Sequence, residues 1–300
     1  MAEKLVGYVY LTLAMATVGS TVIASKLIAH GLPPFSATAL RFAIALPLFL
    51  VLMLMTRTAW PRLDRHAWAL LALQAGAGSV GYTTLLISGL GYTSAANACV
   101  VIGTLPVVSA CTAIVVLGER PQPMLVAAIL VATAGVAAIS FTPDASGEHS
   151  LFGDALILAA VFCEGIFILL NKRLPVQIPP LAQSTLMTGF GLVLATAAAT
   201  LEAPLQGMGS SAALAGVVYY ALVPTVGGFL LWYLGAARVT GAEASLFTAV
   251  APVSAVLLAA LVLGEAVNPN QIVGIGCVLF AVLSLGLSQA GVLRLRRSRA

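Results

Sequence analysis

The sequence has few charged residues for its length. Of its 300 residues only 8% are charged, whereas 60% are hydrophobic and the mean hydropathy is +1.06. A soluble domain carries about 25% charged residues, which it needs to cover its surface. The shortage of charge therefore excludes a soluble globular protein and predicts an integral membrane protein.

The sequence also lacks the residue groups of common cofactor and catalytic sites. Its four cysteines lie apart inside apolar runs without a C-x-x-C pair, and the phosphate-binding pattern G-x-x-x-x-G-K-[ST] is absent. The three histidines, His30, His66 and His149, fall between apolar runs. We therefore expect no metal, no cofactor and no enzyme activity. The net charge of +4 is spread over the ends of the runs, which does not favour nucleic acid as a partner.

Long apolar runs make up most of the chain. A helix needs about 20 apolar residues to cross the hydrocarbon core of a bilayer, and continuous runs favour helices over barrel strands. The sequence predicts ten spans, at residues 7–28, 34–55, 67–89, 95–117, 122–141, 152–171, 179–200, 211–234, 241–263 and 269–289.

Lysine and arginine predict the orientation of these spans, because they are enriched on the cytoplasmic side. With the N-terminus inside, the outer segments hold only Lys26, and Arg41 lies within a span. The inner segments hold Lys4, Arg57, Arg62, Arg65, Arg120, Lys172, Arg173, Arg238, Arg294, Arg296, Arg297 and Arg299. We expect a multi-pass protein of the cell inner (plasma) membrane with both termini in the cytoplasm.

The stretch Leu-Gly-Glu occurs twice, ending at Glu119 and at Glu265, an offset of 146 residues. The same offset pairs Gly7 with Gly153, Lys26 with Lys172, Gly81 with Gly227, Pro106 with Pro252 and Pro123 with Pro269. The chain is thus predicted to hold two copies of a five-helix unit, residues 1–145 and 146–300. Because five is odd, the copies insert in opposite orientations, an architecture frequent in secondary transporters. The predicted fold is an all-α membrane protein of ten transmembrane helices in two inverted five-helix repeats around a central cavity.

Three stretches carry a family resemblance: GYTSAANACVVIGTLPVVSACTAIVVLGERPQP at 91–123, its weaker copy AARVTGAEASLFTAVAPVSAVLLAALVLGEAVNP at 236–269, and LRF at 40–42. With them the chain resembles the drug/metabolite transporter superfamily, in its ten-helix EamA-type branch. Among the members it is most similar to bacterial exporters of aromatic amino acids. The resemblance implies a transporter of small metabolites and covers nearly the whole chain.

Two kinds of repeated position have structural interpretations. Pro106 and Pro252 lie near the middle of their spans, where a proline removes a backbone hydrogen bond. Each is expected to kink its helix, either as a hinge beside the cavity or as a static packing device. The repeated helix ends, Gly118 with Glu119 and Gly264 with Glu265, are interpreted as structural: the glycine ends one helix and the carboxylate meets the N-terminus of the next.

Polar side chains at membrane depth are the candidate site. Glu164 lies mid-span and either exchanges a proton, meets a substrate ammonium, or holds helices together as a hydrogen-bonded group. Arg41 binds a substrate carboxylate, snorkels outward or pairs with an acid. The residues expected to line the substrate pathway are Tyr8, Ser20, Tyr82, Thr83, Asn97, Glu164, Trp232 and Tyr233.

The predicted function follows from the inverted repeat and from the scarcity of charged residues at membrane depth. A phosphorylated substrate would need several Lys or Arg side chains within the membrane-spanning segments, and only Arg41 lies at such a depth. We expect a secondary transporter that exports small metabolites across the inner membrane, with neutral amino acids, including aromatic and hydrophobic ones, as substrates and protons as a candidate coupling ion. The alternatives are a broad-specificity drug or metabolite efflux protein of the same fold and, least favoured, an intramembrane enzyme.

Overall fold

The computed structural model describes residues 2–93, 98, 101–118, 120–140, 150–175, 177–202, 210–263 and 269–297. Every regular element in these ranges is helical. The elements are α1 (Ala2–Ala29), α2 (Pro34–Thr56), α3 (Arg65–Gln74), η1 (Ala75–Gly81), α4 (Tyr82–Leu90), α6 (Leu105–Leu117), α7 (Pro123–Ser140), α8 (Leu151–Arg173), α9 (Pro180–Ala199), α10 (Ser211–Tyr220), η2 (Ala221–Gly228), α11 (Phe229–Ala236), α12 (Gly241–Phe247), α13 (Val250–Leu263) and α14 (Pro269–Arg297).

The helices have the length and apolar composition of a membrane protein. Within the described ranges, seven helical segments are long and apolar enough to span a bilayer, and 123–136 and 272–284 are shorter apolar helices. The predicted fourth span, 95–117, lies partly outside the described residues. Large apolar side chains such as Leu54, Val115 and Leu261 are exposed, as expected for helices that face lipid tails. The predicted all-α membrane fold is confirmed.

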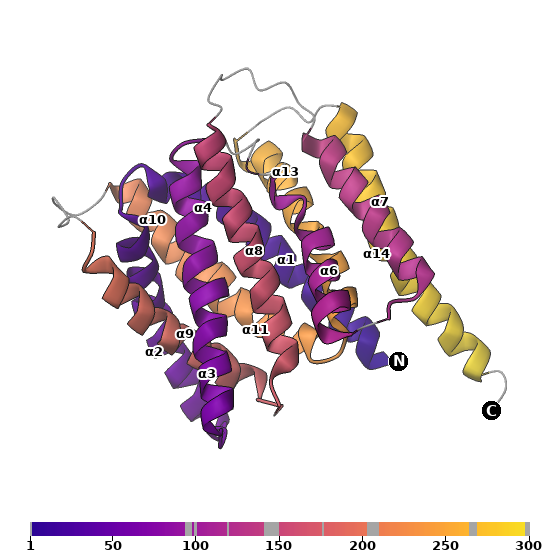
Figure 1. Cartoon of the computed structure of the whole chain (residues 1–300), viewed down its shortest axis with the longest axis horizontal. Coiled ribbons are helices and arrows are strands. Elements are labelled where there is room, and N and C mark those ends of the chain that lie inside the picture. The colour runs from indigo at the N-terminus through magenta and orange to yellow at the C-terminus, as the bar shows by residue number, and fades with distance from the viewer. Residues whose placement is uncertain are drawn as a thin grey trace.

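The two halves have matching element boundaries. Helix α3 begins at Arg65 and α10 begins at Ser211, while η1 begins at Ala75 and η2 at Ala221, in each case 146 residues later. Helices α2 and α9, and likewise α7 and α14, begin at prolines with the same offset. In Figure 1, α8 runs from the top of the molecule downward, whereas α1 begins at the lower right and runs upward. The halves are therefore repeats of opposite orientation.

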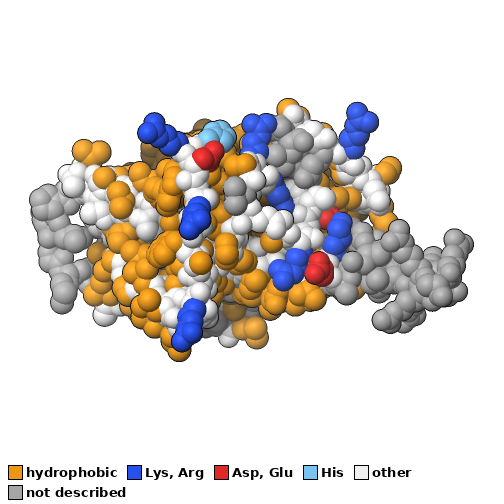
Figure 2. Space-filling view, turned by 90° about the horizontal axis from the view of Figure 1, so that it is seen from below, with side chains coloured by type: hydrophobic (Ala, Val, Ile, Leu, Met, Phe, Trp, Pro, Cys, Tyr) orange, Lys and Arg blue, Asp and Glu red, His pale blue; other side chains and the backbone are white. Residues whose placement is uncertain are grey.

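The molecule has two ends, which we call the terminal face and the opposite face. The terminal face is the lower end in Figure 1, where α1 begins and α14 ends. Figure 2 shows this face, over which Lys and Arg side chains are spread among few acidic ones. Here Lys4 of α1 forms an ion pair with Glu243 of α12 at 2.8 Å, and Tyr8 donates a hydrogen bond to the same carboxylate. Thr240 and Glu243 form a capping box, which fixes the start of α12 beside α1.

Glycines allow the closest helix contacts. A Cβ atom at Gly19 of α1 would lie 1.8 Å from the Ser254 hydroxyl of α13, and one at Gly135 of α7 would lie 2.8 Å from the Gly274 carbonyl oxygen of α14. Close approach of this kind is typical of helix pairs in membranes, where packing replaces the hydrophobic effect as the source of association. The α7–α14 pair lies side by side at one edge of the bundle (Figure 1), away from the other helices that surround the centre.

The repeated prolines lie just after helix breaks. Residues 103–104 form a turn before α6, and residues 248–249 form a turn between α12 and α13. Pro106 and Pro252 are thus in the first turn of α6 and α13, a position where a proline costs little because the backbone N–H has no helical partner. The expected kink is in fact a break in each span. Gly118 follows α6 with a φ of 68°, while Glu119, Gly264 and Glu265 lie outside the described residues.

Candidate functional site

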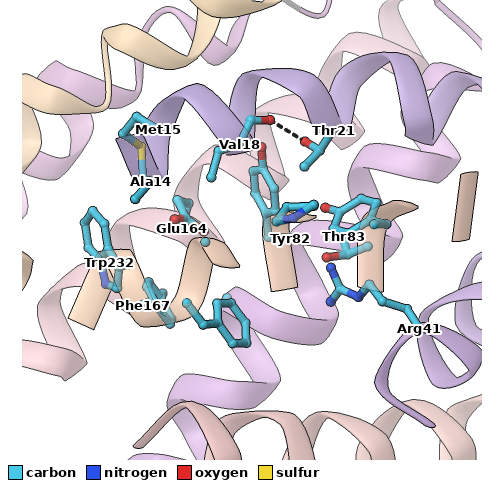
Figure 3. A pocket seen from close by; sticks show the side chains of 15 residues that line it. Ala14, Met15, Val18, Thr21, Arg41, Tyr82, Thr83, Glu164, Phe167 and Trp232 are labelled. Atoms are coloured by element: carbon cyan, nitrogen blue, oxygen red, sulfur yellow. Dashed lines mark hydrogen bonds between the residues drawn. The ribbon is translucent and has the colours of Figure 1, made fainter. Parts of the chain in front are cut away.

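A cavity lies at the centre of the bundle, between the two repeats. The space in it that is not filled by atoms amounts to about 540 Å³, part of which is open to solvent. The first repeat contributes side chains of α1, α2, η1 and α4, and the second contributes those of α8, α10, η2 and α11. Figure 3 shows these side chains converging on one space. The lining residues are Ala14, Met15, Val18, Thr21, Arg41, Gly78, Tyr82, Thr83, Glu164, Phe167, Tyr220, Pro224, Gly228, Phe229 and Trp232.

Arg41 supplies the positive charge of the cavity. It is only 4% exposed, so it does not snorkel outward, and no ion pair to it is formed within the described ranges. Its guanidinium carbon lies 4.1 Å from the ring centroid of Phe42 and 4.4 Å from that of Tyr220, which are cation–π distances. One Nη donates to the carbonyl oxygen of Ser79 at 2.8 Å, whereas the buried Nε has no hydrogen-bond partner among the residues that the structure describes. Arg41 is therefore held in place with donor capacity left over for an anionic group.

Glu164 supplies the negative charge. It comes from the middle of α8 and is partly exposed to the cavity. In the described part of the chain, the Glu164 carboxylate has no hydrogen bond and no basic partner. No contact there supports the interpretation that Glu164 holds helices together through a hydrogen bond. A carboxylate in such an apolar place must take up a proton or meet a cation to offset its loss of hydration.

Aromatic rings form the wall nearest Glu164. The Phe167 ring centroid lies 5.9 Å from that of Trp232 and 6.2 Å from that of Tyr233. In Figure 3, Phe167 and Trp232 lie on the side of Glu164, whereas Arg41 lies across the cavity beyond Tyr82. The indole Nε1 of Trp232 is buried and finds no hydrogen-bond partner in the described part of the chain. The cavity can therefore hold an apolar or aromatic body between groups of opposite charge.

Two π-helical segments border the cavity, η1 with Gly78 and η2 with Pro224 and Gly228. A π-helical turn shifts the register of the hydrogen bonds and is frequent at functional sites. In η2 the Thr225 hydroxyl donates to the carbonyl oxygen of Tyr220, and Pro224 accounts for part of the altered bonding because it lacks an N–H. In η1 a Cβ atom at position 78 would lie 2.3 Å from the Phe167 ring, so only glycine leaves that ring in place.

The structure brings together four of the predicted pathway residues, Tyr82, Thr83, Glu164 and Trp232. Three further ones, Tyr8, Ser20 and Tyr233, lie elsewhere. Tyr8 donates its hydroxyl to Glu243, Ser20 faces a groove between α1, α10 and α13, and Tyr233 lines a vestibule at the terminal face. Asn97 lies outside the described residues.

This vestibule is a polar recess of the terminal face, with about 1400 Å³ of space not filled by atoms, part of which is open solvent. Lys172 and Asn171 of α8, Gln183 of α9 and Arg238 after α11 line it. Tyr233 faces the vestibule and packs against Phe167, which lines the central cavity. The aromatic cluster thus separates the vestibule from the cavity.

Sequence reasoning missed several cavity residues, notably Phe167, Tyr220 and Thr21. In a helix that is apolar on all sides, periodicity does not reveal which face is turned inward, so no local signal selected them. The capping box at Glu243 did have a signal, Thr followed three residues later by Glu at the start of an apolar run. Within the described ranges, no three His, Cys, Asp or Glu side chains gather around one point as a metal would require.

Comparison with known proteins gives a consistent result. The model of the EamA-like transporter family matches residues 5–141 and again 151–287. The uncharacterized transporter YetK of Bacillus subtilis (strain 168) is 34% identical over 285 residues, which cover 93% of this chain and 86% of YetK. An uncharacterized transporter of Archaeoglobus fulgidus is 27% identical over 279 residues, covering 92% of this chain and 96% of the relative. One crystal structure of a protein matches with a TM-score of 0.73 at 21% identity, covering 94% of this chain and 97% of the other, which supports the fold alone.

Proposed function

The chain belongs to the EamA-like transporter family of the drug/metabolite transporter superfamily and is thus a multi-pass membrane transporter, and we propose that the small metabolites it exports are neutral amino acids. Aromatic and hydrophobic amino acids are the substrates we favour. Export takes place across the inner membrane by alternating access of the central cavity to the two faces. The terminal face, over which Lys and Arg side chains are spread, is then cytoplasmic.

The central observation is that Arg41 and Glu164 lie in one apolar cavity without each other as partners. A zwitterion offers a carboxylate to Arg41 and an ammonium to Glu164, so that each buried charge gains a counter-charge on binding. The side chain of the amino-acid substrate is accommodated by the aromatic rings of Tyr82, Phe167 and Trp232. A single arginine gives too little positive charge for a phosphorylated substrate, and it favours a carboxylate, which it can bind through two parallel hydrogen bonds.

Counterflow in proteoliposomes tests the proposal. Vesicles preloaded with unlabelled phenylalanine or leucine should accumulate the labelled amino acid, and excess amino acid outside should compete. Phenethylamine, which lacks the carboxylate, should not compete, because it leaves Arg41 unpaired. Competition by cationic dyes as strong as by amino acids would instead support the broad-specificity efflux alternative, for which the apolar aromatic wall is the supporting feature.

Arg41→Gln provides the matched variant. It should reduce amino-acid counterflow by about tenfold or more, since a hydrogen bond to a charged group contributes about 1.5–3 kcal/mol. Arg62→Gln, at an exposed residue between α2 and α3, should leave counterflow unchanged. Undiminished counterflow by Arg41→Gln would contradict the assignment of the carboxylate to this residue.

A further inference from the structure

Lys26 and Lys172, the lysines that recur at the repeat offset, make equivalent hydrogen bonds. The Lys26 Nζ donates to the carbonyl oxygens of Leu90 at 3.2 Å and Thr93 at 3.3 Å. The Lys172 Nζ donates to the carbonyl oxygens of Ala236 and Val239. The donor and both acceptors are each displaced by the same 146 residues, so one device is built twice, once at each face.

The acceptors explain why a lysine is used. Leu90 and Ala236 are the last residues of α4 and α11, where carbonyl groups lack helical partners and the helix dipole is negative. Each ammonium therefore makes charge-assisted hydrogen bonds with the end of a helix that it does not belong to. Both lysines are partly buried, which strengthens these bonds relative to the same contacts in water.

Glycine contacts show where helices of the two repeats pack most closely. A Cβ atom at Gly235 of α11 would lie 3.0 Å from the Gly7 carbonyl oxygen of α1. In the equivalent contact, a Cβ atom at Gly89 of α4 would lie 3.1 Å from the Gly153 carbonyl oxygen of α8. These glycines also correspond at the 146-residue offset. Helix α1 is thus tightly packed on α11, and α4 on α8, which gives two close-packed pairs that each combine helices of both repeats.

The lysines connect these two pairs to each other. Lys26 joins α1 to α4 at the opposite face, and Lys172 joins α8 to α11 at the terminal face. The cavity lies between the pairs, with Val18 on one side and Tyr82 and Glu164 on the other. Any motion that opens the cavity to one face by separating the pairs must break the lysine bonds at that face.

We propose that Lys26 and Lys172 are the two latches of alternating access, an inference that rests on the alternating-access part of the proposed function. Release of Lys26 opens the cavity to the opposite face, and release of Lys172 opens it to the terminal face. Both sets of bonds are formed in this structure, so it corresponds to the arrangement with both latches closed. The lysines act as positioning residues and do not contact substrate.

Thiol labelling of the cavity tests the latches. In a chain with all four cysteines replaced by serine, Val18→Cys places a reporter in the cavity wall. A membrane-impermeant thiol reagent is applied from one side at a time, in right-side-out and inside-out vesicles, without substrate. Lys26→Met should speed labelling from the opposite face by about five- to tenfold and slow it from the terminal face, because the lost bonds shift the conformational equilibrium. Lys172→Met should have the reverse effect.

The opposite signs separate a latch from a merely stabilising contact. Loss of stability would speed labelling from both faces in both variants, and this result, or unchanged rates in both, would overturn the proposal. Arg62→Met, at the terminal face and away from the cavity, should leave both rates within about twofold. Size-exclusion chromatography checks folding, and where Lys→Met fails to fold, Lys→Gln at the same position must produce the same reversal. Because no substrate is present, the outcome does not depend on which solute counterflow identifies.

Discussion

At the scale of single residues, the site depends on two charges in an otherwise apolar space. The positive charge of Arg41 is stabilised by the faces of two aromatic rings and by a hydrogen bond to a carbonyl oxygen. The guanidinium can therefore stay charged in the cavity without a counter-ion. Glu164 has no such compensation within the described ranges. Under the proposed function, the Glu164 carboxylate is therefore the group that we expect to take up a proton or to pair with the substrate during transport.

Glu164→Gln separates proton coupling from substrate binding. If Glu164 carries a proton in one direction, the variant should lose amino-acid accumulation driven by an imposed pH gradient, down to the level of vesicles without a gradient. Counterflow, which needs no net proton movement, should persist at a reduced level, because the glutamine amide oxygen can still accept a hydrogen bond from the substrate ammonium but no longer offers it a counter-charge. Both assays use the same proteoliposomes. Gradient-driven accumulation equal to that of the unmodified protein would rule out Glu164 as the coupling group.

At the scale of elements, glycine determines where helices approach and therefore which ones form units. Gly19 lies at the crossing of α1 and α13, where the Ser254 hydroxyl donates to the Ala16 carbonyl oxygen at 3.2 Å. A Cβ atom at position 19 would also lie 2.2 Å from the Ala251 carbonyl oxygen. This neighbour is backbone, so a side chain at position 19 forces the two helices apart instead of displacing a rotamer.

Gly19→Ala should therefore destabilise the protein by about 1–3 kcal/mol, the usual effect of overpacking. The measurement is the midpoint of thermal unfolding in detergent, followed by tryptophan fluorescence. Gly276→Ala in α14 is the matched control, because a Cβ atom there meets nothing within 4 Å. It should be neutral or slightly stabilising, since alanine is the better helix former by about 1 kcal/mol. Equal midpoints for the two variants would show that the α1–α13 crossing is not close-packed.

At the scale of the whole molecule, the sequence predicted what depends on length and repetition. The spans follow from apolar runs of bilayer length, and the inverted repeat follows from an offset that Lys26, Gly81 and Pro106 share with their partners. The rotation of each helix about its axis does not follow, because these helices are apolar both toward lipid and toward their neighbours. For this reason the sequence does not decide among three roles for Arg41, and it does not predict the two π-helical segments.

Topology is the last property of the whole molecule that follows from the repeat. Ser146 falls between the repeats and Arg296 near the end of α14, so an odd number of spans separates them. In a cysteine-free chain, Ser146→Cys should react with an impermeant thiol reagent in intact cells, and Arg296→Cys only in inside-out vesicles. The reason is that five spans place residue 146 on the opposite face, whereas ten return the chain to the terminal face, where the positive residues favour the cytoplasm. Reaction of both cysteines from the same side would contradict the five-helix unit itself, and reversed sides would contradict only the orientation.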